Sequence, residues 1–304
     1  MDCHIQNLPF DPTALHGLSE KLLLSHHQND YGGAVHRLNA IRMHLTTLSP
    51  TTAPGYVWNG LKREELMATN AMLLHELYFG CLGGNGSEMS PAMALALSAS
   101  FGSVALWRDE FAAMGRAMGS GSGWVLLVYQ PREGHLVNQW AADHTQALVG
   151  GIPLLALDMY EHAYHLDYGP AAGPYVEAFM ANIAWNTVYA RYQQAIYGVS
   201  ESLGANHAEV EGALLVDVRR EGVYKTALTR IAGAQWKDPS DIERWAKELP
   251  QDRAIVVYCV YGHEVSRSAA MRLRAAGLNV RFLRGGIDAW EAAGQRIEHK
   301  ATAT

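Results

Sequence analysis

The order of apolar segments changes near residue 200, and this change limits the possible folds more than any other feature of the sequence. Before it, long stretches with apolar residues at helical spacing surround a small group of strand-like runs. After it, short apolar runs alternate with helical stretches, which is the pattern of a parallel sheet with crossover helices. Since 304 residues are also more than one ordinary domain holds, we predict two domains.

The first predicted domain is α+β and spans residues 1–197, with an N-terminal helical hairpin, a small antiparallel sheet and further helices. A polar linker is expected at 198–208, and an α/β domain with a parallel sheet and a C-terminal tail at 209–304. Charge supports this division, because residues 1–198 have 9 Lys+Arg and 16 Asp+Glu, whereas 199–304 have 15 and 14.

Periodicity predicts the elements of each domain. In the first, we expect helices at 18–48, with Ser19 as N-cap, and at 62–80, 90–118 and 174–196, and strands at 124–129, 136–140 and 153–157. In the second, we expect strands at 213–218, 254–258 and 279–283, and helices at 239–248, at 266–276 and around Trp290.

Composition excludes several classes of protein. A net charge of −6 argues against a general nucleic-acid binder. No segment has the roughly 18 uncharged apolar residues of a membrane span, and the first residues do not resemble a secretory signal. The cysteines Cys3, Cys81 and Cys259 are far apart and form no CxxC pair, so we expect a reducing compartment and a cytoplasmic protein.

The segment Asp158-Met-Tyr-Glu-His162 follows a run that reads as a buried strand. A carboxylate that enters a core is costly unless it is paired or bound to a metal. The segment by itself leaves two interpretations open: Asp158 and His162 bind a metal ion, or Asp158 caps the next turn while His162 is an ordinary core histidine.

The wider sequence resembles the iron/manganese superoxide dismutases over about residues 8–196. Asp158-Met-Tyr-Glu-His-Ala-Tyr164 is similar to the signature of that family, which usually has Trp where Tyr160 stands. Other landmarks occur in the family's order and at about its spacings: Leu8-Pro9-Phe10, His75 before Cys81-Leu82, Ser100-Phe101-Gly102-Ser103, Gly121-Ser-Gly-Trp124 and Trp185.

This resemblance implies a single iron or manganese ion, with the ligands His26, His75, Asp158 and His162. It also implies dismutation of superoxide to dioxygen and hydrogen peroxide. Neutral imidazoles and one carboxylate give the centre a net charge of about +1 both with a trivalent metal and hydroxide and with a divalent metal and water. The net charge of the centre then stays constant while one electron and one proton are taken up. Nitrogen and oxygen ligands suit iron or manganese, although zinc also accepts similar ligands.

The resemblance suggests three further residues around the metal. His144, 14 residues before Asp158, is similar to the family's outer histidine against the metal-bound solvent, and its ordinary alternative is a surface loop histidine. Trp124 resembles the aromatic wall of the site, although an isolated Trp also fits a simple core. Most members have Tyr where Ala34 stands, and Tyr31 is the nearest tyrosine that could reach the entrance.

The family resemblance also implies a homodimer. Glu161 resembles the carboxylate that members place across the dimer, with a solvated surface charge as the alternative. Where many members have a His–Tyr pair between subunits, this chain has Asp30 and His165, which we expect to hydrogen-bond across the interface.

Residues from about 209 to 298 resemble a single rhodanese domain, on the strength of Val216-Asp-Val-Arg219, Gly233-Ala234, Val256-Val-Tyr-Cys259 and Gly285-Gly-Ile-Asp-Ala-Trp290. The resemblance implies sulfur transfer through a Cys259 persulfide, whereas an isolated cysteine is also often structural. A thiolate there would be favoured by loop amides and a helix N-terminus. Many members have Arg five residues after the cysteine. Here that position is Glu264, which would repel an anionic sulfur donor. Arg267 lies further along the chain, and His263 could supply a proton.

Three functions follow. The first is a superoxide dismutase with an appended rhodanese-like module and superoxide as its small substrate. The second is a sulfurtransferase that acts through Cys259 beside a mainly structural metal domain, and the third is a metal-dependent redox sensor. The identity of the metal, the sulfur donor and the sulfur acceptor stay open at this point.

Overall fold

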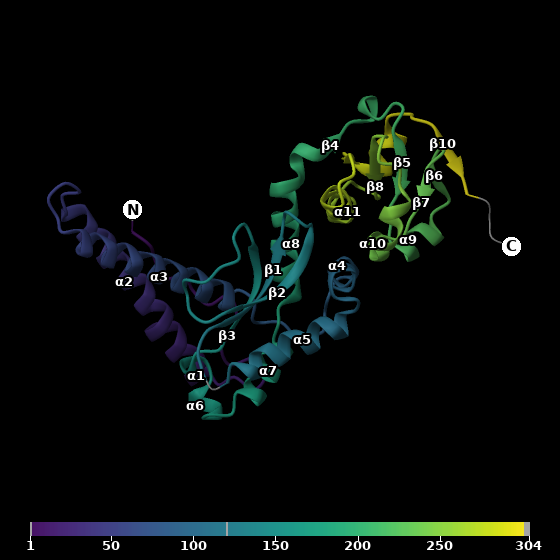
Figure 1. Ribbon diagram of the computed structural model, residues 1–304. Coiled ribbons are helices and arrows are strands. Elements are labelled where there is room, and N and C mark those ends of the chain that lie inside the picture. The colour runs from purple at the N-terminus through teal and green to yellow at the C-terminus, as the bar shows by residue number, and fades with distance from the viewer. Residues whose placement is uncertain (1, 120, 301–304) are drawn as a thin grey trace.

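The structure is a computed structural model that describes residues 2–119 and 121–300. It forms two lobes, with helix α8 (Trp185–Ser200) leading from the first toward the second (Figure 1). The predicted two-domain architecture is confirmed. Met1 of the first predicted domain and residues 301–304 of the predicted tail lie outside the described residues.

The first lobe begins with a helical hairpin. Its first arm consists of α1 (Glu20–Ser25), the π-helical turn η1 (His26–Tyr31) and α2 (Gly32–Thr47). Ser19 is the N-cap as predicted, because its side chain accepts a hydrogen bond from Leu22 N. The second arm, α3 (Gly55–Phe79), begins earlier than predicted, since Pro54 ends the connecting loop at the residue before the helix.

Two predicted helices are each divided in the structure. The stretch 90–118 forms α4 (Pro91–Phe101) and α5 (Val104–Ala117), because Gly102 adopts φ +87° and Ser103 caps the new helix. The stretch 174–196 forms α7 (Ala172–Ala181) and α8, with Asn182 between them.

The antiparallel sheet of the first lobe has the strand order β2-β1-β3. Its strands are β1 (Trp124–Gln130), β2 (His135–Ala141) and β3 (Ile152–Asp158), close to the predicted runs. Strand β3 ends at Asp158 and is followed by the 3-10 turn η2 (Glu161–Ala163) and the short helix α6 (His165–Tyr168). Asp158, the last residue of β3, therefore lies directly before the segment that contains His162.

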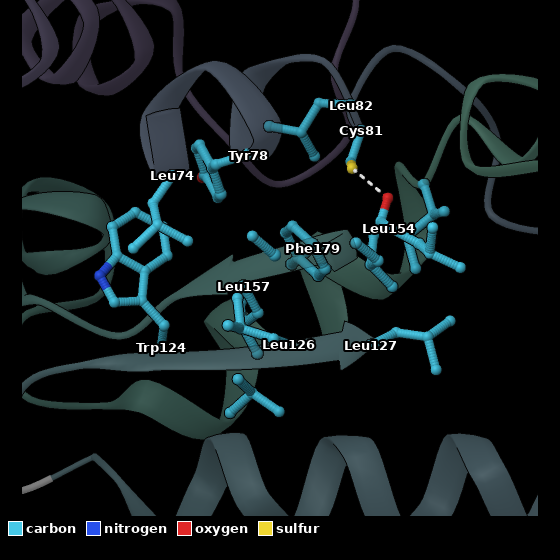
Figure 2. Packing of buried hydrophobic residues seen from close by; sticks show 14 of the residues in the cluster. Leu74, Tyr78, Cys81, Leu82, Trp124, Leu126, Leu127, Leu154, Leu157 and Phe179 are labelled. Atoms are coloured by element: carbon cyan, nitrogen blue, oxygen red, sulfur yellow. Dashed lines mark hydrogen bonds between the residues drawn. The ribbon is translucent and has the colours of Figure 1, made fainter. Parts of the chain in front are cut away.

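One buried cluster joins the hairpin to the sheet. Figure 2 shows Leu74 and Tyr78 of α3 directed toward the strands that carry Leu126 and Leu157. Cys81 is buried beside them, and its thiol donates a hydrogen bond to the Leu154 carbonyl at 3.5 Å. The helix with His75 is thus fixed against the sheet with Asp158.

The second lobe contains a parallel sheet with the order β4-β9-β8-β5-β7, as its alternating pattern predicted. An antiparallel pair, β6 with β10, lies beside it. The strands are β4 (Gly204–Ala205), β5 (Leu214–Asp217), β6 (Thr229–Ile231), β7 (Gln235–Trp236), β8 (Ile255–Tyr258), β9 (Val280–Leu283) and β10 (Ile297–His299). The helices are η4 (His207–Glu209), α9 (Glu221–Thr226), η5 (Pro239–Asp241), α10 (Ile242–Trp245), η6 (Ala246–Glu248), α11 (Glu264–Ala275) and α12 (Gly286–Ala292).

The residues predicted to form a linker, 198–208, have regular structure. Helix α8 continues to Ser200, the turn η3 (Glu201–Leu203) follows, and β4 pairs with β9. Within the described residues no helix combines the length and the apolar character needed to cross a membrane.

The close approach of the loops at Gly84 and Ile183 generates a prediction of stability. A Cβ atom on Gly84 would lie 2.2 Å from the Ile183 carbonyl oxygen, so the loop after α3 and the segment before α8 leave no room for a side chain. We expect Gly84→Ala to lower the free energy of unfolding by about 1–3 kcal/mol, measured by urea denaturation.

The matched control is Gly198→Ala on α8, where an added Cβ would meet no atom within 4 Å. That substitution should leave stability unchanged or raise it by up to about 1 kcal/mol, since alanine favours a helix. Equal effects of the two substitutions would contradict the packing argument.

Candidate metal centre and cysteine loop

The four predicted ligand side chains come from separate elements and converge at one point. His26 begins η1, His75 lies in the last turns of α3, Asp158 ends β3 and His162 lies in η2. One nitrogen or oxygen from each lies within 4.8 Å of the others. His26, His75 and Asp158 are buried, and His162 is partly exposed, so the cluster has one side open.

The three imidazoles approach the same oxygen. Asp158 Oδ2 lies 3.2 Å from His26 Nε2, 3.5 Å from His75 Nε2 and 3.3 Å from His162 Nε2. His26 Nε2 and His75 Nε2 are buried without a hydrogen bond of good geometry. Buried ring nitrogens that lack a partner and face a carboxylate fit the donor set of a metal ion.

Backbone and side-chain contacts fix these groups. His75 Nδ1 lies 2.7 Å from the Ala71 carbonyl oxygen, so this nitrogen carries the proton and Nε2 keeps its lone pair. Tyr160 N donates to Asp158 Oδ1 at 2.8 Å, which leaves Oδ2 facing the histidines. Tyr175 Oη donates to the Asp158 carbonyl at 2.7 Å and holds the end of β3.

The pKa is lowered for two of the three histidines of the cluster and raised for the third. Burial lowers the pKa of His75 to about 3 and lowers the pKa of His26, so both rings are neutral near pH 7. Burial also acts to lower the pKa of His162, but the carboxylates of Asp158 and Asp30 outweigh it and raise that pKa. For Asp158 burial opposes ionisation, yet His162 and His26 hold its pKa below the ordinary range.

Asp30 lies beside His162 within the same chain. Its Oδ1 is 3.4 Å from His162 Nδ1, on the side of the ring opposite Asp158. A carboxylate behind a metal-binding imidazole orients the ring and strengthens it as a ligand. This contact is one that the sequence reasoning missed, because it assigned Asp30 to a dimer contact with His165, which is exposed on α6.

His144 and Trp124 meet at the edge of the cluster. Trp124 Nε1 donates to His144 Nδ1 at 3.0 Å, and the His144 ring stacks on Tyr160 with centroids 4.8 Å apart. The His144 ring centre is 6.1 Å from that of His75. Asn70 Nδ2 donates to the His144 carbonyl at 2.6 Å, a contact with no sequence signal.

A cleft of about 370 Å³ leads to His75, His144 and His162. Gly33 and Ala34 line it, so the small side chain at position 34 leaves the entrance wide. The remaining lining residues are Asn29, Asp30, Arg37, Met67, Ala68 and Ala71.

Tyr31 does not line this cleft. Its hydroxyl donates to Glu76 Oε1 and accepts from Gln6 N, both at 2.9 Å, in a separate pocket. Burial, together with Glu76, raises the pKa of Tyr31 to about 12. The structure therefore directs this hydroxyl away from the entrance that the sequence analysis assigned to it, because Tyr31, the last residue of η1, faces Gln6 and Glu76, whereas Ala34 on α2 lines the cleft.

The Cys259 loop connects β8 with α11. Cys259 is buried, and its sulfur lies 3.2 Å from Ser266 Oγ. Ile287 N donates to the Cys259 carbonyl and Asp288 N to the Val260 carbonyl, both at 3.0 Å, so the start of α12 holds the loop.

The remaining loop residues point in different directions. Glu264 is buried, His263 and Tyr261 are exposed, and their two rings lie 5.6 Å apart. Arg267 Nε donates to the Gly262 carbonyl at 3.0 Å.

The Asp30 contact generates a prediction of metal affinity. Asp30→Asn should weaken iron or manganese binding by about 10–100-fold, because His162 loses the carboxylate that orients it. Metal content and competition with a chelator measure this without an activity assay. Asp109→Asn, which removes an exposed acid on α5, is the control and should change nothing. Equal metal affinities of the two variants would refute an orienting role for Asp30.

Comparisons with known proteins agree with this geometry. Residues 89–191 match the family described as iron/manganese superoxide dismutases, C-terminal domain, and residues 201–293 match the rhodanese-like domain. The chain is 58% identical to an iron superoxide dismutase of Cupriavidus metallidurans over 186 residues, which cover 61% of this chain and 94% of that protein.

More distant relatives include enzymes named for either metal. A manganese superoxide dismutase of Haloferax volcanii is 36% identical over 200 residues, which cover 64% of this chain and 97% of that protein. An iron superoxide dismutase of Aquifex pyrophilus is 34% identical over 193 residues, which cover 61% of this chain and 89% of that protein. The chain therefore belongs to the iron/manganese superoxide dismutase family and carries a C-terminal rhodanese-like domain.

Proposed function

We propose that this chain dismutates superoxide at one iron or manganese ion held by His26, His75, Asp158 and His162. The observation that carries the proposal is the approach of three imidazole nitrogens to one oxygen of a buried carboxylate, at 3.2–3.5 Å. Nitrogen and oxygen donors of this kind suit iron and manganese. The relatives named for these two metals support the same assignment over zinc.

The chemistry that either metal supplies when bound is one-electron transfer in both directions, so that two superoxide ions and two protons become dioxygen and hydrogen peroxide. Among the four donor side chains Asp158 is the one carboxylate, so the donors themselves bring a single negative charge to a bound cation. Neutral His26 and His75 need no deprotonation before they bind a cation, since burial already disfavours their protonated forms.

His144 is suited to hold a proton at the cleft. Since Trp124 Nε1 is a donor only, His144 Nδ1 must accept from it, and the proton of the neutral ring is then on Nε2. Burial lowers the pKa of His144, so the ring is neutral near pH 7. A neutral imidazole with Nε2–H can donate a hydrogen bond to solvent or substrate in the cleft.

The cleft supplies access for a small anion. Ala34 leaves it open, and the exposed Arg37 guanidinium lies at its wall, where a positive charge attracts superoxide. Glu64 pairs with Arg37, so this attraction is weaker than that of a free cation. We therefore assign Arg37 a role in guiding substrate, not in the chemistry.

On sequence grounds the domains are proposed at 1–197 and 209–304, and strand β4 of the linker between them adds to the sheet of the C-terminal module. A reducing, cytoplasmic setting fits three cysteines that have no disulfide partner in the described part of the chain. The alternative of a sulfurtransferase with a mainly structural metal domain has less support, because a cleft leads to the histidine cluster.

The separate roles of the two lobes generate a prediction of activity. His162→Ala should abolish superoxide dismutation and most metal binding, because it removes one of the four donors. Cys259→Ser should retain the activity within about twofold, since it lies in the other lobe. Dismutation assays with metal analysis of the same samples measure both. The reverse pattern, with activity lost in Cys259→Ser and kept in His162→Ala, would overturn the proposal.

The dimer generates a second prediction. We propose that Glu161, exposed beside His162, contacts a second copy of the chain, and that Asp30, whose Oδ1 faces His162 of its own chain, also meets His165 of the partner subunit. Glu161→Ala should then weaken dimerisation by about tenfold or more, measured by sedimentation velocity over a range of concentrations. Glu211→Ala, an exposed acid of the second lobe, is the control. A monomeric wild-type chain, or equal behaviour of the two variants, would refute the dimer.

A further inference from the structure

A hydrogen-bonded group of side chains lies next to the histidine cluster, in a pocket separate from the cleft. At its centre is Tyr31, the last residue of η1, with only 1% of its surface exposed. The Tyr31 hydroxyl donates to Glu76 Oε1 and accepts a hydrogen bond from Gln6 N, both at 2.9 Å. Three segments therefore meet at one hydroxyl: the N-terminal segment, the π-helical turn and α3.

The last two of these segments carry two of the four proposed metal donors. Tyr31 lies in η1 together with His26, and Glu76 directly follows His75 on α3. The ring centres of Tyr31 and His75 are 6.4 Å apart, and those of His26 and His75 are 5.1 Å apart. The bond between Tyr31 and Glu76 thus joins the element that bears one donor to the element that bears another.

The N-terminal segment holds the same π-helical turn at a second point. His27 Nε2 lies 2.8 Å from the Gln6 carbonyl oxygen, and since a carbonyl only accepts, the imidazole is the donor. The carbonyl and the N–H of Gln6 are therefore bound by side chains near the start and at the end of η1. A π-helical turn is rare and occurs mostly at functional sites, so the contacts that hold this one bear on the donor that it carries.

The contact between Tyr31 and Glu76 is specific. Within the described residues Glu76 forms no ion pair, and Tyr31 is the hydrogen-bond partner of its side chain. Since the phenol is buried, loss of the carboxylate would leave a buried donor without an acceptor. Neither side chain belongs to the donor set or lines the cleft, so neither has a part in the chemistry described above.

We propose that Tyr31 and Glu76 are positioning residues of the metal centre: their hydrogen bond sets the spacing between the π-helical turn and α3, and with it the directions from which His26 and His75 approach the metal. The inference rests on the metal binding proposed above. It gives Tyr31 a role in supporting two donors in place of a role at the entrance.

Removal of this bond should weaken metal binding although all four donors remain. Tyr31→Phe keeps the buried ring and loses the hydroxyl, whereas Glu76→Leu loses the acceptor, and each should weaken iron or manganese binding by about tenfold. The double variant should also be weaker by only about tenfold, since both changes remove the same bond. Glu76→Gln keeps an oxygen that accepts from the phenol, so its affinity should stay within about threefold of the wild type.

Two measurements on the full-length protein test this. Competition with a chelator gives the affinity, and the electron paramagnetic resonance spectrum of the ferric protein reports the directions of the donors, which a loss of fold stability alone does not change. Tyr31→Phe and Glu76→Leu should alter this spectrum in the same way, and Glu76→Gln should keep the wild-type spectrum. The matched control is Tyr56→Phe, which removes an exposed hydroxyl from α3 and should change neither quantity.

The outcomes separate this inference from the proposed function. A wild type that binds metal, with affinities and spectra equal to those of the variants, would overturn the inference alone. Weaker binding with an unchanged ferric spectrum would assign the pair to fold stability and would also overturn it. If Tyr31→Phe does not fold, Glu76→Leu and Glu76→Gln still decide, because position 76 is only partly buried. A wild type that binds neither iron nor manganese would refute the proposed function and the inference together.

Discussion

The buried Asp158 carboxylate is the constraint on which the dismutase lobe depends. A lone carboxylate at the end of a buried strand is costly, and in this fold hydrogen bonds and nearby imidazoles compensate that cost. The π-helical turn brings His26 to it, α3 brings His75, and η2 brings His162. The long hairpin, the sheet and the following turn are packed so that these separate segments end at a single oxygen.

The order of elements explains why this centre is rigid on one side and open on the other. His75 and Asp158 are fixed by the packing of α3 on the sheet, where Tyr78, Leu157 and Phe179 are buried (Figure 2). His162 lies in a short turn and faces the cleft with Asp30. A rigid wall and an accessible ligand suit a centre that must admit a small substrate without moving its donors.

The rhodanese-like domain is packed against the dismutase domain at the helix that follows its cysteine loop. Helix α8 both completes the dismutase lobe and binds the start of α11, so the rhodanese-like loop is built against a neighbouring domain. The residue that departs from the family pattern, Glu264, is the one that makes this contact. Its departure is therefore explained by packing between domains and does not by itself indicate a lost function.

The sequence by itself determined the two-domain architecture, the type of each sheet and the identity of the side chains that converge at Asp158. The architecture and the sheet types follow from periodicity, which is a local property of the chain, and the ligand set follows from the resemblance to the iron/manganese superoxide dismutases. It did not locate the helix breaks at Gly102 and Asn182, because helical spacing continues across both.

Only the tertiary structure decided which partners the polar side chains take. It placed Asp30 beside His162, directed the Tyr31 hydroxyl to Glu76, and joined Glu264 to Tyr189 and Gln193. The physical reason is that a hydrogen bond depends on distance and direction between residues that are far apart in the chain, and neither composition nor spacing contains that information.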